Sequence, residues 1–226
     1  MTNSRPAPSA SPAASGAGLP AFKRERRTRI LEAALGALQG QEFEQIRIAE
    51  VAQGADVALG TLYRYFPSKE LLYAVALREW VHRQRLDAAM PGRTPEERIR
   101  ARLRGVIGAF EAQPQFFKTH LLLYGSGDPE VEAILGEVSA LAEEVLTGDF
   151  AALSVAEPRD DATMLWSILH SLLSSAIYQG GAFGEVYRLV DDFITLVLET
   201  RDGPVSGSPA KPGPQEPATG PNEHGR

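Results

Sequence analysis

The chain has 226 residues, of which 43% are hydrophobic, so it can bury one large core or two small ones. No run approaches the roughly 18–20 apolar residues of a membrane span, and the N-terminus lacks the apolar segment of a signal peptide. The absence of cysteine excludes disulfides and thiolate chemistry, and together these features predict a cytoplasmic protein.

The formal net charge of -6 is unevenly distributed. Residues 22–85 carry 11 Lys/Arg against 8 Asp/Glu, a net of +3, whereas residues 86–201 carry 9 against 18, a net of -9. A basic front half and an acidic back half suggest two different tasks on one chain.

Segments 1–21 and 202–226 are rich in Pro, Ala, Ser and Gly and contain almost no bulky apolar residues. They cannot bury enough surface to offset the entropy of ordering, so we predict two disordered tails. The residues between them show no sustained alternation of period two and no hairpin signal, which indicates an all-α protein.

The first predicted helix covers 26–40 and ends at a glycine. Two short helices follow, over 47–55 and 59–66, and Pro67 ends the second. Ser68 is the expected N-cap of a long helix through Met90 that carries its apolar residues at helical spacing.

Further helix starts are marked by caps. Thr94 followed by a proline and Glu97 forms a capping box, and Asp128 caps another helix in the same way. Between these two, Pro114 opens a shorter helix that runs through Tyr124. The chain then ends in two strongly apolar helices, separated by two glycines, over 162–179 and 183–200.

The two short helices and the turn "GADVAL" between them form a helix-turn-helix unit. The second helix of such a unit enters the major groove, so its leading residues must be small or must reach base edges. Ala58, Gly60 and Thr61 are small. Leu62 and Phe66, four residues apart, are expected to form the buried side.

Residues 51–72, "VAQGADVALGTLYRYFPSKELL", resemble the DNA-binding signature of the TetR family of transcriptional repressors. The ordered Gly-Thr-Leu-Tyr-x-Tyr-Phe-x-x-Lys spacing carries the resemblance. It implies a homodimer, an operator with dyad symmetry and a small-molecule inducer. Within the family, "ADVALGTLYRYFPSK" is most similar to a branch that represses sterol and lipid catabolism.

The resemblance also implies roles for individual residues. Thr61, Tyr65 and Lys69 match phosphate-contacting positions of the family. The face that meets the groove carries Gly60, Thr61, Tyr63 and Arg64, where Arg64 is either a base-reading residue or a solvated charge. The tyrosines could instead be half-buried core residues.

One position departs from the family pattern. Arg47 stands where a Ser or Thr is common before the first short helix, so the hydroxyl cap is missing, although Arg47 could reach a phosphate itself. The basic run 23–29 includes Arg24 and Arg27 and reads either as a solvated face or as an arm in the minor groove.

No catalytic motif is present: the sequence has no Walker loop, HExxH, GxSxG or dinucleotide fingerprint. His82, His120 and His170 are scattered without metal-ligand spacing, and adjacent acidic residues do not share a helix face. We therefore expect no enzymatic activity, no cofactor and no metal. The alternative of an enzyme with its active site in the helical domain is disfavoured, because the sequence offers no paired nucleophile and base and no metal-ligand set.

The aromatic residues of the acidic back half, residues 86–201, either belong to the hydrophobic core or line a ligand cavity. We expect the cavity residues to be Phe110, Phe116, Phe117, Tyr124, Trp166 and Tyr178. The net charge of -9 favours a largely apolar neutral or cationic inducer. An acyl-CoA fits only if Arg100 or Arg104 meets its phosphates; the lipid-branch resemblance favours that case slightly.

The sequence predicts two domains. Residues 22–72 form the DNA-binding domain and residues 73–201 the regulatory and dimerisation domain, with the helix of about 68–90 spanning both. The two last helices are expected to pair with their counterparts in a second copy, with Leu172 and Phe193 in the interface. The alternative is a DNA-binding activator or architectural protein without an inducer.

Overall fold

The structure is a computed structural model that describes residues 20–84, 88, 90 and 93–202. Within the described residues, every regular element is helical, which confirms the predicted all-α class. In chain order the elements are α2 (Ala21–Gly40), the 3-10 helix η1 (Phe43–Gln45), α3 (Ile48–Gly54), α4 (Leu59–Tyr65), α5 (Lys69–Arg83), α6 (Pro95–Ala112), α7 (Pro114–Tyr124), α8 (Pro129–Ala152), α9 (Pro158–Gln179) and α10 (Phe183–Asp202).

The predicted helix caps are confirmed. The Ser68 hydroxyl accepts a hydrogen bond from a first-turn backbone N–H of α5. At the start of α6, Thr94 Oγ1 accepts from the Glu97 N–H at 3.2 Å, and Glu97 Oε2 accepts from the Thr94 N–H at 2.8 Å. Asp128 accepts from the Glu130 N–H at 2.8 Å. These bonds satisfy N–H groups that have no partner within a helix.

Three helix boundaries differ from the prediction by more than a residue or two. Helix α2 begins at Ala21, before the predicted start at 26. Helix α9 begins at Pro158, four residues before the predicted start at 162, because Asp160 and Asp161 form a polar first turn that apolar periodicity does not detect. Helix α5 ends at Arg83. Most of the predicted continuation toward residue 90, and nearly all of both predicted tails, lie outside the described residues.

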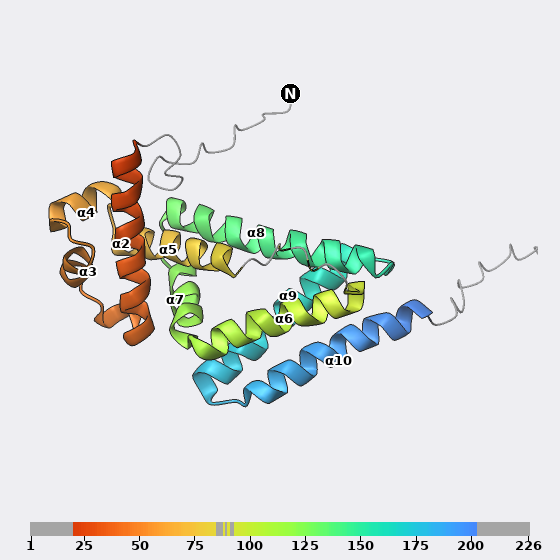
Figure 1. Ribbon diagram of the computed structural model, residues 1–226. Coiled ribbons are helices and arrows are strands. Elements are labelled where there is room, and N and C mark those ends of the chain that lie inside the picture. The colour runs from red at the N-terminus through yellow and green to blue at the C-terminus, as the bar shows by residue number, and fades with distance from the viewer. Residues whose placement is uncertain (1–19, 85–87, 89, 91–92, 203–226) are drawn as a thin grey trace, which may run out of the picture.

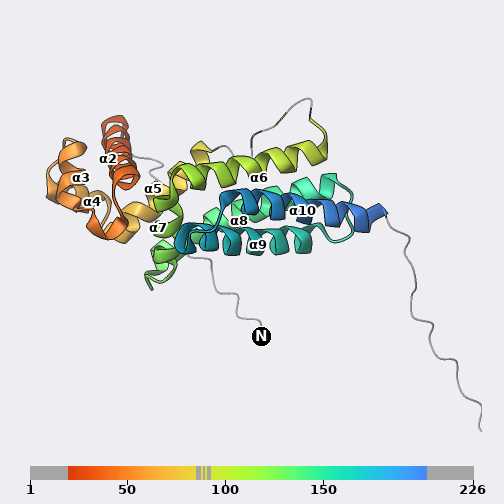
Figure 2. The ribbon, with the colours of Figure 1, turned by 90° about the horizontal axis from the view of Figure 1, so that it is seen from below.

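The helices form two groups that α5 connects. Figure 1 shows α2, α3 and α4 together at one end of the molecule, which we call the head, and α6 to α10 at the other, which we call the bundle. The view from below shows α9 and α10 side by side along the bundle (Figure 2). Helix α5 packs against α2 on the head side and α8 on the bundle side.

The hydrophobic core is divided less sharply than the predicted domains. One cluster holds the head residues together with all buried residues of α5, and it continues to Phe116 of α7 and Leu135 of α8. The second cluster joins α6, α9 and α10 around Ile107, Leu169 and Val190. The first core therefore crosses the proposed boundary at residue 72, which makes α5 a structural part of both groups.

A helix-turn-helix surface and an apolar cavity

The turn between α3 and α4 depends on one residue with a left-handed backbone. Asp56 has a φ of 53°, a conformation that Asp tolerates better than most residues other than glycine. The turn is closed by the Val57 N–H, which donates to the Ala52 carbonyl at 3.0 Å. These contacts fix the angle at which α4 leaves α3.

Helix α4 has one buried side and one exposed side. The predicted inward residues Leu62 and Phe66 are both 0% exposed. On the opposite side, Tyr63 is 44% exposed and Arg64 is also exposed. A side chain added at Gly60 would meet no atom within 4 Å, so this position faces open space. The outer side of α4 thus presents small, aromatic and basic groups together.

Three residues at the predicted phosphate positions are half-buried: Thr61, Tyr65 and Lys69. The Lys69 ammonium donates to the Ile46 carbonyl at 2.8 Å and lies 4.4 Å from the centre of the Phe43 ring. Desolvation by burial lowers the pKa of Lys69. An ammonium group has three donors, so this anchored lysine keeps others for a phosphate.

Two arginines of the predicted basic arm differ in their surroundings. Arg24 is exposed on α2. Arg27 is only 9% exposed, its guanidinium lies 5.5 Å from the centre of the Phe66 ring, and burial lowers its pKa. Arg27 is thus packed inside the head, where its charged group covers an aromatic core residue, and its contact with DNA stays a prediction.

Arg47 precedes α3 and makes no side-chain cap, in line with the missing hydroxyl. Its guanidinium lies 3.9 Å from the Glu50 carboxylate, and its side chain is 82% exposed. The group is thus on the surface near the start of α3.

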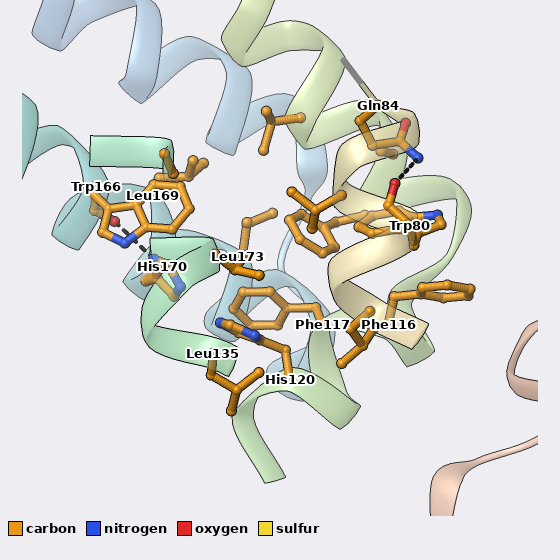
Figure 3. A pocket seen from close by; sticks show the side chains of 17 residues that line it. Trp80, Gln84, Phe116, Phe117, His120, Leu135, Trp166, Leu169, His170 and Leu173 are labelled. Carbon is orange, nitrogen blue, oxygen red and sulfur yellow. Dashed lines mark hydrogen bonds between the residues drawn. The ribbon is translucent and has the colours of Figure 1, made fainter. Parts of the chain in front are cut away.

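A cavity of about 50 Å³ lies between α5, α6, α7, α8 and α9. Four of the six predicted aromatic residues line it: Phe110, Phe116, Phe117 and Trp166. Trp80 of α5 joins them, 4.8 Å from Phe116 and 5.3 Å from Phe110 between ring centres. Figure 3 shows Trp80 and Phe116 on one side of the pocket, with Trp166 and His170 on the opposite side.

The other two predicted aromatics do not line the cavity. Tyr124 is largely outside, and its hydroxyl lies 2.6 Å from the Ser139 hydroxyl. Tyr178 is 54% exposed, and its ring centre lies 6.0 Å from the Lys118 ammonium near the head. Helical periodicity alone could not separate these two exposed tyrosines from the cavity residues.

The cavity also contains three polar side chains, which the sequence analysis did not assign to a ligand site. His120 of α7 and His170 of α9 both line it, with ring centres 5.9 Å apart, together with Gln84. Burial and the neighbouring His170 lower the pKa of His120 to about 4. Burial also lowers the pKa of His170. The two histidines are 50 positions apart, so no local spacing could have paired them.

Arg100 and Arg104, the arginines considered for an acyl-CoA, lie elsewhere. Arg100 Nη1 is 3.2 Å and Arg104 Nη2 is 2.6 Å from carboxylate oxygens of Asp191, between α6 and α10. The side-chain hydrogen bond to Asp191 raises the pKa of Arg104. Neither residue lines the cavity, so both charges are already paired at a different place.

A shallow groove runs along the outer side of α9 and α10. Leu172 and Phe193, the predicted interface residues, line it and are half-buried. Leu196 lies beside them and is 60% exposed. This groove is a largely apolar surface, with Asp192 and Glu199 also in its lining, on the two helices that were expected to pair.

The described residues contain no group of three or more His, Cys, Asp or Glu side chains that could hold a metal ion. In the same part of the chain, no helix combines the length and apolar character that crossing a bilayer requires.

Comparison with known proteins agrees with this architecture. The family described as "Bacterial regulatory proteins, tetR family" matches residues 30–76, from α2 to the middle of α5. The transcriptional repressor KstR of Mycolicibacterium smegmatis is 30% identical over 192 residues, covering 80% of this chain and 91% of that protein. KstR of Rhodococcus jostii is 34% identical over 143 residues, covering 62% of this chain and 65% of that protein.

Solved structures show the same fold at lower identity. A TetR transcriptional regulator from Rhodococcus sp. RHA1 has a TM-score of 0.64 at 21% identity, over 80% of this chain and 99% of that chain. FadR of Thermus thermophilus, in complex with lauroyl-CoA, has a TM-score of 0.58 at 20% identity, over 80% of this chain and 100% of that chain.

A helix-turn-helix head joined by one helix to an all-helical bundle defines a DNA-binding transcriptional regulator. The chain belongs to the TetR family of bacterial regulatory proteins, because the M. smegmatis repressor matches it over most of both chains.

Proposed function

We propose that this chain is a ligand-responsive repressor that binds a palindromic operator as a homodimer and leaves it when a largely apolar small molecule occupies the cavity. The observation that supports it is the position of α5. Leu71 and Leu72 at its start belong to the head core, whereas Leu77 and Trp80 further along line the cavity. A shift of α5 that a ligand causes is therefore passed directly to the head.

The small size of the cavity supports this coupling. About 50 Å³ holds a few water molecules at most, whereas drug-sized ligands occupy about 300–1,000 Å³. An inducer can enter only by displacing the walls, and α5 is one of these walls. By linkage, whatever favours the displaced position of α5 disfavours DNA, and DNA disfavours the inducer to the same extent.

On DNA, we assign base reading to Arg64 and close approach to the groove to Gly60, with Tyr63 beside them. We assign phosphate contacts to Thr61 and Tyr65 of α4 and to Lys69 at the start of α5. Arg24 and Arg47 add exposed charge at the edges of the head. In a dimer, two copies of α4 enter successive major grooves about 34–36 Å apart.

We assign the dimer contact to the groove on α9 and α10. A two-fold dimer makes this apolar surface self-complementary and matches a palindromic operator. Leu172→Arg or Phe193→Arg would place a charge in the interface and should give monomers that bind the operator weakly. Leu122→Arg, at an exposed leucine of α7, is the matched control. A wild-type protein that sediments as a monomer at micromolar concentration would contradict the assignment.

Cavity chemistry favours a neutral inducer over an acyl-CoA. No Asp, Glu, Lys or Arg side chain lines the cavity among the described residues, and burial lowers the pKa of both histidines, which favours their neutral rings. Arg100 and Arg104 are already held by Asp191. An acyl-CoA would therefore need to place its phosphates on other residues, although the FadR structure of T. thermophilus contains lauroyl-CoA.

The decisive experiment combines two measurements. An operator is first selected from a random DNA pool, and its release is followed by fluorescence anisotropy while sterols, fatty acids, acyl-CoAs and aromatic compounds are titrated. Both tryptophans of the chain line the cavity, so their emission reports its occupancy at the same time. If DNA is bound but no compound changes either signal, the protein is a DNA-binding regulator without an inducer.

A further inference from the structure

The cavity is apolar except at one place. The two imidazole rings of His120 and His170 face each other there, 5.9 Å between centres, one from α7 and one from α9. Aromatic rings hold both in position: Phe117 lies 5.8 Å and Trp166 4.4 Å from the His170 ring, and Tyr124 lies 4.9 Å from the His120 ring. In Figure 3 the His120 ring lies between the two walls of the pocket.

The hydrogen bonds fix which nitrogen of His170 carries the proton. Its Nδ1 lies 3.1 Å from the Trp166 carbonyl oxygen, which can only accept a hydrogen bond. Nδ1 is therefore the donor, and in the neutral ring Nε2 is left as an acceptor. His120 forms no hydrogen bond with another described residue, and its neutral ring offers one donor and one acceptor.

Resting on the proposed function, we propose that the inducer is a neutral, largely apolar compound carrying a hydroxyl group that binds between His120 and His170. The hydroxyl oxygen accepts a hydrogen bond from the His120 ring N–H and donates its own hydrogen to His170 Nε2. A carbonyl group can use only the His120 donor. A carboxylate finds no cation in the lining, so its burial is costly.

In the described part of the chain, the lining also holds no counter-charge for a protonated amine. His170 offers one lone pair, and no acidic side chain lines the cavity in the described residues. A protonated amine would lose its hydrogen bonds to water without gaining a counter-charge, and attraction to the aromatic faces offsets only part of this cost, so we expect the neutral alcohol to bind more tightly. Apolar contact with the aromatic walls therefore provides most of the affinity. The two histidines make the site prefer a ligand with a hydroxyl group.

The test uses probes that differ in one group on two skeletons. For a compact skeleton these are 1-adamantanol, 1-fluoroadamantane and adamantane-1-carboxylate, and for a linear one 1-octanol, 1-fluorooctane and octanoate. Binding is followed at pH 7.5 through the emission of Trp80 and Trp166, which both line the cavity. We expect the alcohol to bind most tightly and the carboxylate most weakly on the better-fitting skeleton.

Substitutions then separate the histidines from the cavity as a whole. His120→Leu and His170→Leu should each weaken alcohol binding about tenfold while leaving the fluoro compound within about twofold, because only the alcohol loses a hydrogen bond. His120→Gln, which keeps a donor and an acceptor, should retain most of the affinity for the alcohol. His82→Leu, at an exposed histidine of α5, is the control.

The outcomes distinguish the two proposals. If the alcohol and the fluoro compound bind alike in wild type and in both leucine variants, the histidines do not select the ligand, while the cavity remains the inducer site. A carboxylate that binds most tightly overturns the neutral-ligand assignment. If no probe on either skeleton changes the tryptophan emission, this inference fails, and the inducer part of the proposed function fails with it if the wider compound titration is also silent, whereas operator binding is judged by the anisotropy measurement.

Discussion

The head and the bundle place their polar side chains in opposite ways. Among the described residues of the head, the buried polar or charged residue is Arg27, which covers an aromatic ring, and the polar groups of α4 face outward. The bundle buries Arg102, Asp149, Thr119 and His120. The outward-facing residues of the head are those that can contact DNA, whereas the polar residues of the bundle are placed by packing between helices. The head therefore carries a family motif that can be recognised in the sequence, and the bundle does not.

The largest expected effect concerns the buried ion pair of the bundle. Arg102 Nε donates to Asp149 Oδ2 at 2.7 Å, and both side chains are more than nine-tenths buried. Asp149→Ala leaves a buried guanidinium without its counter-charge and should lower the free energy of unfolding by about 3–5 kcal/mol. Urea unfolding followed by tryptophan emission measures the loss.

Two variants control this measurement. Arg188→Ala removes a surface pair with Asp192 and should cost less than about 1 kcal/mol. Replacing both buried partners, as Arg102→Met with Asp149→Leu, should recover most of the lost stability. A loss below about 1 kcal/mol in Asp149→Ala would show that the pair is solvated, and the contrast between head and bundle would then disappear.

The second effect tests the outward-facing side of the head. Arg64→Ala should cost about 1–3 kcal/mol of operator affinity in each half-site and relax the preference at one base pair, without lowering the melting temperature. Lys69→Ala should instead weaken all sequences alike and reduce the salt dependence by about one unit of slope. Binding to a set of operator variants at several salt concentrations separates the two roles.

An unchanged base preference in Arg64→Ala would show that this side chain does not read the operator. A large loss of stability in Lys69→Ala would show that its bond to the Ile46 carbonyl serves mainly the fold.

The third effect is a pH dependence that belongs to the bundle. His120 has a pKa of about 4 in the folded protein, below its ordinary value of 6.5, because burial and His170 oppose its charge. The unfolded chain therefore binds more protons between these values, so stability falls as the pH falls from about 6.5 toward 4. His170, whose pKa is also lowered by burial, adds to the same trend.

Between pH 7.5 and pH 5, the loss that His120 contributes should be about 2 kcal/mol. Chemical denaturation across this range measures it, and His120→Leu should flatten the curve by that amount. His82→Leu, at an exposed position, should leave the curve unchanged. Equal slopes in wild type and His120→Leu would mean that the His120 ring is solvated in the folded protein.

The smallest effect on stability concerns the contact between the two groups of helices. Lys118 of α7 lies 2.8 Å from Glu42, next to η1 in the head, and both side chains are partly exposed. Lys118→Met or Glu42→Gln should change the free energy of unfolding by no more than about 1 kcal/mol. Because α7 also carries cavity residues, either change should reduce the loss of DNA affinity that a bound inducer causes.

The measurement is the ratio of operator affinities with and without a saturating inducer, in both single variants and the double variant. If the ratio equals that of the wild type in all three, the ion pair does not carry the coupling, and it only holds the head against α7.

Local signals in the sequence were enough to predict most of the fold. Ser68, Thr94 and Asp128 cap helices as expected, because a cap depends on atoms only two or three residues away. The alternation of Leu62 and Phe66 with exposed residues on α4 is equally local. The start of α9 was missed because its first turn is polar, so apolar periodicity began one turn too late.

Tertiary structure alone decided what lies inside the bundle. Several helices that each present apolar residues can be packed in many ways, and the sequence does not say which aromatic residues meet. Packing placed Phe117 and Trp166 at the cavity and left Tyr178 outside, and it brought together His120 and His170 from separate helices. Packing also buried Arg27, which charge alone marks as a surface residue. The sequence by itself determined the helices and the reading head, because these follow from neighbours along the chain. The cavity and its two histidines depend on contacts between helices far apart in the sequence, which only the packed structure defines.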